Sequence, residues 1–112
     1  MSSWFGGDSD QAQAYNQYQQ YDDPQAHKAE LSHELIAGAA SYEAAKAYEN
    51  HCERNGQPGS HAEAKELLAG FAGAFIDREA ETKGLDFVDR EKAKYEASRQ
   101  CHEAYDQNNG QY

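Results

Sequence analysis

Apolar and small residues recur at intervals of three and four positions in three stretches of the chain, at 31–45, 67–75 and 88–105. This is the spacing of one face of an α-helix. The third stretch is the weakest, because its face includes serine and histidine as well as valine and tyrosine. The pattern predicts an all-α fold, a small antiparallel bundle of three main helices.

Capping residues place the ends of the first predicted helix, which spans 24–54. Asp23 can cap a helix, and Pro24 has a backbone angle suited to the first helical position. At the other end, Asn55 and Gly56 supply the left-handed backbone that commonly terminates a helix.

The second predicted helix begins after Pro58-Gly59, where Ser60-His61-Ala62-Glu63 fits the capping box S-x-x-E. We expect Ser60 to accept from the Glu63 amide, and the Glu63 carboxylate to reach back to the Ser60 amide. This helix stops near Gly84, and a third spans 86–105. The bundle domain is predicted over 24–106, with a frayed C-terminus at 107–112.

Residues 1–23 differ in composition from the rest of the chain. They are rich in Gln, Tyr and Asp and contain no Lys or Arg. Low-complexity polar sequence of this kind is typical of disorder. We therefore predict a disordered N-terminal tail, whose aromatic residues offer weak contacts.

Small residues interrupt the middle of the first two helices, as Ala37-Gly38-Ala39-Ala40 and as Ala69-Gly70-Phe71-Ala72-Gly73. Glycine inside a helix costs about 0.5–1 kcal/mol relative to alanine, so a compensating gain is expected. Close packing of the two backbones is one interpretation, and a dimer interface on the same faces is the other. The candidate residues for helix packing or self-association are Gly38, Ala39, Gly70, Phe71, Gly73 and Phe75.

Large aliphatic residues and phenylalanine are scarce, whereas alanine is abundant. Alanine favours helix but buries little surface, so the helices are expected to be weakly held in a single chain. Small bundles of this kind often need a partner chain. The expected partner is a second copy of the chain, as a homo-oligomer, or another protein.

The formal net charge is −10. An acidic chain repels phosphate backbones and anionic lipid surfaces, which excludes nucleic acid and membrane as expected partners. The longest uninterrupted apolar run, 67–76, is about half of what a bilayer span needs. The N-terminus lacks the features of a secretory signal. Two cysteines in such a chain suggest a reducing compartment, so we expect a cytoplasmic protein that can also enter the nucleus.

Five residues raise the alternative of a metal or redox site. An up-down-up bundle places the ends of the first and third helices and the start of the second together, and thiolates with imidazoles suit zinc. These candidate residues are His51, Cys52, His61, Cys101 and His102.

A depth estimate weakens that alternative. If the helices end as predicted, the residue level with His61 lies near 108, and Cys101 lies roughly 10 Å deeper. The spacing matches no established zinc pattern. We therefore expect no cofactor, with zinc as the alternative.

Motifs for catalysis are missing from the sequence. Glu30-x-x-His33 is a single Glu-x-x-His, whereas a di-iron bundle needs two such motifs. The chain contains neither a Walker A motif nor a nucleophile elbow. We therefore predict that the protein is not an enzyme.

Three segments together resemble the fungal CipC-like proteins, named for concanamycin-induced protein C. They are SSWFGGDSDQAQAYNQY near the start, SHELIAGAASYEAAKAYE at 32–49, and AKELLAGFAGAFIDREAETKGLDFVDREKAK at 64–94. The resemblance covers most of the chain and implies a small intracellular protein linked to stress or antibiotic response. It implies no catalytic mechanism and no site residues.

The sequence therefore predicts a non-enzymatic, stress-associated protein that acts through self-association or protein–protein interaction. The alternative is a metal-binding or thiol-redox-responsive helical protein.

Overall fold

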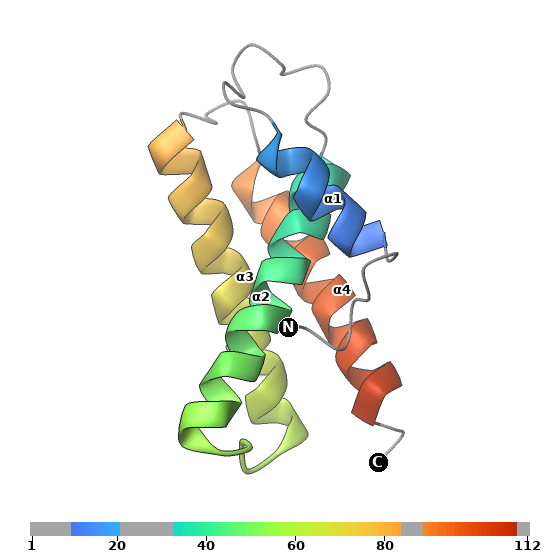
Figure 1. Ribbon diagram of the computed structural model, residues 1–112, viewed down its shortest axis with the longest axis vertical. Helices are drawn as coiled ribbons and strands as arrows, with labels where there is room; N and C mark the ends of the chain where they lie inside the picture. Colours follow the sequence, from blue (N-terminus) through green and yellow to red (C-terminus); the bar gives the residue numbers. More distant parts are fainter. Residues whose placement is uncertain (1–9, 21–32, 84–88, 110–112) are drawn as a thin grey trace.

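The computed structural model describes residues 10–20, 33–83 and 89–109, and every regular element in these ranges is an α-helix. The helices are α1 (Asp10–Gln19), α2 (His33–Asn55), α3 (His61–Lys83) and α4 (Arg90–Asn109) (Figure 1). The prediction of an all-α fold is confirmed for this part of the chain.

The three long helices lie side by side along the long axis of the molecule (Figure 1). α2 and α3 are joined by the short loop at 56–60 and run in opposite directions. α3 and α4 also run in opposite directions, since His61 contacts Tyr105 near one end while Asp77 contacts Lys94 towards the other. The ion pair of Asp77 with Lys94 lowers the pKa of the Asp77 carboxyl.

The number of helices differs from the prediction, because a fourth helix forms within residues predicted as a disordered tail. α1 spans Asp10–Gln19 and crosses the α2 side of the bundle. Its formation is a tertiary effect. Tyr18 is buried against the other helices, and this burial outweighs the polar composition that predicted disorder. The rest of the predicted tail, 1–9 and 21–23, lies outside the described residues.

The bounds of α3 agree with the prediction, whereas those of α4 do not. α4 begins at Arg90, and Asp89 caps it by accepting from the amide of Lys92 at 3.2 Å. It continues to Asn109, beyond the predicted end at Tyr105, and Asp106 in this last turn pairs with Lys65. The predicted start of the first helix, near Pro24, lies outside the described residues.

Alanine dominates the core. The large side chains in it are few, and Tyr18, Ile36, Leu68 and Ile76 are almost completely buried. The fully buried alanines are Ala37, Ala39, Ala40, Ala44, Ala45, Ala64, Ala72, Ala93 and Ala97. Because alanine side chains are short, such a core requires the helix backbones to approach closely.

The contact between α2 and α4 illustrates this close approach. The buried Ser41 hydroxyl lies 2.8 Å from the carbonyl oxygen of Ala37, on its own helix, and 3.1 Å from that of Ala97 on α4. The Cys101 thiol lies 3.8 Å from the carbonyl oxygen of Ser41. The short side chains of Ser41 and Cys101 therefore contact the facing backbone directly.

Among the described residues, no helix combines the length and the hydrophobicity needed to cross a membrane.

Candidate functional site

The loop between α2 and α3 forms through two local signals in the sequence. Gly56 has a φ of +82°, and its amide donates to the carbonyl of Cys52 at 2.8 Å, which ends α2. The Ser60 hydroxyl accepts from the Glu63 amide at 3.2 Å, as predicted. The Glu63 carboxylate accepts from the Gly59 amide at 2.8 Å instead of the predicted Ser60 amide, so the reciprocal half of the cap is displaced by one residue.

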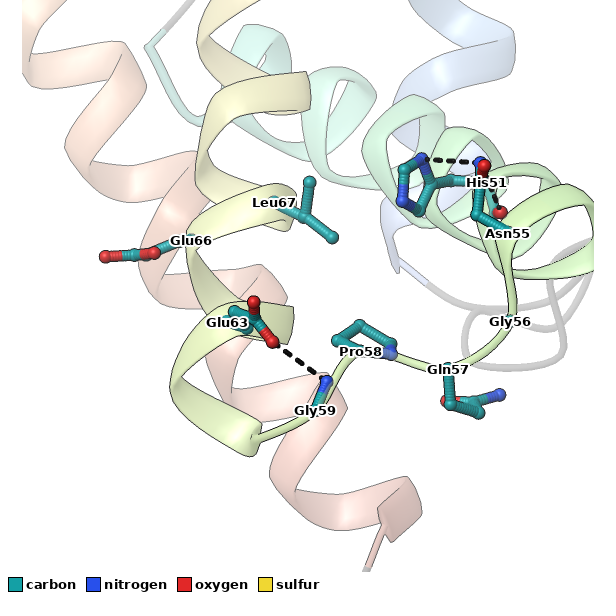
Figure 2. A pocket seen from close by; sticks show the side chains of 9 residues that line it. All are labelled: His51, Asn55, Gly56, Gln57, Pro58, Gly59, Glu63, Glu66 and Leu67. Carbon is teal, nitrogen blue, oxygen red and sulfur yellow. Dashed lines mark hydrogen bonds between the residues drawn. The ribbon is translucent and has the colours of Figure 1, made fainter.

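This loop encloses an open hollow of about 500 Å³ between the facing ends of α2 and α3 (Figure 2). Leu67 and His51 point towards each other across it, and Pro58 forms part of its wall. Glu63 turns to the loop and Glu66 points away from the hollow. The hollow thus has a mixed lining, in which Leu67 and Pro58 are the apolar side chains and His51, Asn55, Gln57, Glu63 and Glu66 are polar.

The structure places the first two metal candidates near this hollow but gives them different surroundings. The His51 ring lies 6.1 Å from the ring of Phe71, centroid to centroid, and its Nδ1 lies 3.4 Å from the Asn55 amide nitrogen. Cys52 is half-buried against the core, beside the Tyr48 hydroxyl. The pKa of Tyr48 is raised mainly by the burial of its own hydroxyl and, to a smaller extent, by the Cys52 thiol.

Of the other three candidates, His61 and His102 lie at the contact between α3 and α4, and Cys101 lies at the contact between α4 and α2. The His61 Nδ1 is hydrogen-bonded to the Tyr105 hydroxyl, and the His102 Nε2–H donates to the carbonyl of Lys65 at 3.1 Å. Cys101 is fully buried. His61 is therefore level with Tyr105, not with a residue near 108 as predicted, and Cys101 lies one helical turn deeper.

The five candidates do not assemble into a metal site. Across the described ranges, no three His, Cys, Asp or Glu side chains are grouped so that they could hold a metal ion. Both cysteines are free thiols, so they form no disulfide with each other. The difference in depth between His61 and Cys101 is one helical turn, which is smaller than predicted. Each candidate side chain nevertheless contacts a different neighbour.

The two thiols are expected to differ in reactivity. Burial raises the pKa of Cys101 to about 12, so at pH 8 this thiol stays protonated and is a poor nucleophile. Cys52 is half-buried and closer to solvent. Iodoacetamide at pH 8 should therefore modify Cys52 first, and Cys101 only when the protein unfolds. Peptide mass spectrometry measures both rates, with denatured protein as the control, and equal rates in the folded protein would contradict this.

The small-residue candidates occupy three different environments. A Cβ atom built on Gly38 would lie 2.8 Å from the Cβ of Ala14 on α1, whereas one on Gly73 would lie 3.7 Å from the Lys94 Cδ on α4. Gly70 is exposed, and nothing lies within 4 Å of such an atom there. The glycines therefore do not bring α2 and α3 together, because Gly38 faces α1 and Gly73 faces α4.

The remaining packing candidates lie in or beside the core. Ala39 and Phe75 are buried, and Phe71 is partly buried against the same cluster. Their place in helix packing follows from this burial, while their part in self-association stays a prediction.

All three long helices contribute side chains to the surface on which α1 docks. From α3, Phe75 meets the Tyr18 ring edge-on at 6.2 Å between centroids, and the Glu79 carboxylate accepts from the Tyr18 hydroxyl at 2.9 Å. Burial and the nearby Glu79 carboxylate raise the pKa of Tyr18, so this hydroxyl remains a donor.

The rest of this surface comes from α2 and α4. Tyr15 packs on Tyr42 of α2 at 5.0 Å between ring centroids, and the Lys46 ammonium lies 5.4 Å from the Tyr15 ring. On the α4 side, the Gln11 amide donates to the Gln100 side-chain oxygen at 2.9 Å. We refer to the residues of α2–α4 that contact α1 as the α1 seat: Gly38, Tyr42, Lys46, Phe75, Glu79 and Gln100.

Sequence reasoning missed the α1 seat, although a signal was present. Gln11, Ala14, Tyr15 and Tyr18 follow helical spacing and are the residues of α1 that make the contacts described above. The glutamines between them suggested disorder instead.

Two glycine variants separate backbone propensity from the α1 contact. Gly70→Ala should raise the free energy of unfolding by about 0.5–1 kcal/mol, because it restricts an exposed helical position without a new contact. Gly38→Ala should gain the same helix propensity but lose about 1–3 kcal/mol by crowding Ala14. Denaturant unfolding measures both. If Gly38→Ala were as stable as Gly70→Ala, Ala14 would not lie against Gly38.

The model of a family described as "Virulence factor CipC-like" matches residues 14–108. No curated protein and no solved structure matches the chain significantly.

Proposed function

The chain belongs to the CipC-like virulence factor family, and from this premise we propose that it is a non-enzymatic, stress-associated protein that acts through self-association or through binding to another protein. The family description supports the association with stress and virulence. The α1 seat supports the proposed mode of action.

One observation carries this proposal: the body formed by α2–α4 holds a short polar helix through side chains of all three helices. Tyr18 is completely buried in the seat, and its hydroxyl has a defined acceptor in Glu79. Binding of an amphipathic helix in a groove is a common mode of recognition between proteins. This arrangement supports recognition of a helix as the mode of action.

The net charge of the chain limits the classes of partner that it can bind. With a formal net charge of −10, long-range repulsion disfavours nucleic acid and anionic membranes and leaves protein as the partner class. We place the protein in the cytoplasm, with access to the nucleus, and assign it no cofactor. A response through a thiol is the second candidate, and half-buried Cys52 is the cysteine that an oxidant would reach first.

Light scattering across a dilution series tests self-association. We expect the mean mass to rise above that of the 12.5 kDa chain as the protein concentration increases. A single mass of one chain at every concentration would overturn self-association. For the thiol candidate, an oxidant response that is unchanged by Cys52→Ser would remove it.

A further inference from the structure

We propose that α1 exchanges between two copies of this chain, so that the α1 of each copy occupies the α1 seat of the other. This inference rests on the proposed self-association and names its surface and its partner. The resulting dimer is symmetric, and each seat is filled by the sequence for which it is shaped.

The first reason is that α1 is not stable as a helix by itself. It has 10 residues, and isolated helices of fewer than about 12–15 residues are marginal in water. Its helical state therefore depends on docking in a seat. Short docked elements of this kind open more readily than the rest of a fold, which makes exchange kinetically accessible.

The second reason is that the seat selects this helix. Gly38 leaves room for Ala14 only because it has no side chain of its own. Glu79 accepts from the hydroxyl of the buried Tyr18. A second copy of the chain presents the same residues in the same order, so its α1 fits the seat with the same packing and the same hydrogen bonds.

The third reason is the charge of the exchanged element. α1 contains one charged residue, Asp10, while the whole chain has a net charge of −10. Transferring a nearly neutral helix to an acidic partner adds little repulsion at the seat. The bodies of the two copies repel each other through their remaining charges, and salt screens this repulsion.

The fourth reason is reach. Twelve residues, 21–32, separate the described end of α1 from the start of α2, and a chain of that length spans at most about 40 Å. The longest extent of the molecule is 43 Å. The maximum span of this segment is thus close to the length of the molecule, which allows α1 to reach a seat on a copy packed alongside. Exchange of an identical element is a low-cost route to a dimer, because every interaction that α1 gives up in its own copy forms again in the other.

Engineered disulfides in the full chain distinguish the two arrangements. Ala14→Cys with Gly38→Cys joins α1 to the seat at a point of close contact. If crowding prevents this variant from folding, Gln11→Cys with Gln100→Cys provides a second pair. Both are made in a Cys52→Ser, Cys101→Ala background, and circular dichroism selects the pair that folds.

Each variant is unfolded, refolded at protein concentrations from about 10 μM to about 1 mM, oxidised and run on a non-reducing gel. The effective concentration of a short tether is in the millimolar range, so exchange should appear towards the upper end of this series. We expect a covalent dimer whose fraction rises at least fivefold across the series. Asn16→Cys with Gly70→Cys, two exposed sites, measures cross-linking by collision.

The outcomes separate the exchange from the broader proposal. Intrachain disulfides at every concentration, with no more covalent dimer than the Asn16/Gly70 control, would overturn the exchange. If light scattering then still showed dimers, self-association would stand and would use another surface. A single-chain mass throughout, together with intrachain disulfides, would overturn both.

Discussion

Replacing Tyr18 by alanine should release α1 from the bundle while α2–α4 stay folded. Removing a large buried aromatic side chain costs about 3–5 kcal/mol in a core that cannot adjust. Tyr18 is completely buried and belongs to a ten-residue helix that depends on docking. The lost packing free energy should therefore cause α1 to detach, and α1 should not stay docked over a cavity. Hydrogen exchange followed by mass spectrometry should show faster exchange across 10–19 with protection of α3 retained.

Two further variants serve as controls for Tyr18→Ala. Tyr18→Phe keeps the ring against Phe75 and removes only the hydrogen bond to Glu79, so it should cost about 1–3 kcal/mol and retain part of the protection. Asn16→Ala changes an exposed position of α1 and should leave docking unchanged or slightly favoured. Unaltered exchange across 10–19 in Tyr18→Ala would show that Tyr18 does not hold α1.

Leu68→Ala should destabilise the whole bundle, by about 2–5 kcal/mol. Leu68 is fully buried in the core cluster, and the alanines of that cluster cannot expand to fill the space it leaves. For a chain of this size the lower limit already corresponds to a fall in Tm of about 8 °C. Thermal unfolding followed by circular dichroism at 222 nm measures the shift.

The neighbouring Leu67 provides the matched control. It has the same side chain on the same helix, but it is only partly buried and lines the open hollow beside His51. Leu67→Ala should therefore cost about 1 kcal/mol, in proportion to the smaller apolar area it removes from contact. Equal costs at the two positions would mean that the core does not lie where the structure places it.

Local signals predicted the turn between α2 and α3 well. Gly56 adopts the left-handed backbone expected after Asn55, and Ser60 accepts from the Glu63 amide. Both features depend on interactions within a few residues, which the sequence displays directly. The start of α4 was harder to predict, because Asp86 and Asp89 are both competent caps and the structure uses Asp89.

The predicted ends of the helices were not enough to show whether the candidate metal residues meet. His61 lies beside Tyr105, and His102 donates to a backbone carbonyl. The predicted ends place these residues on neighbouring helices but do not determine which way each side chain turns. Cys101 does turn towards α2, but it lies beside Ser41, eleven residues before Cys52 on the same helix, so the two thiols stay apart.

The sequence by itself determined the helical class, the caps around 55–63 and the small-residue composition of the core, because each depends on residues close together in the chain. Only the tertiary structure decided that α1 forms and what Gly38 is for. The stability of α1 comes from Tyr18 and Ala14, whose partners are 24 to 61 residues away. The spacing of the contacting residues in α1 is helical, but the sequence does not show which distant residues they meet. The physical reason is that a short polar helix has little free energy of its own, so the seat decides whether it folds.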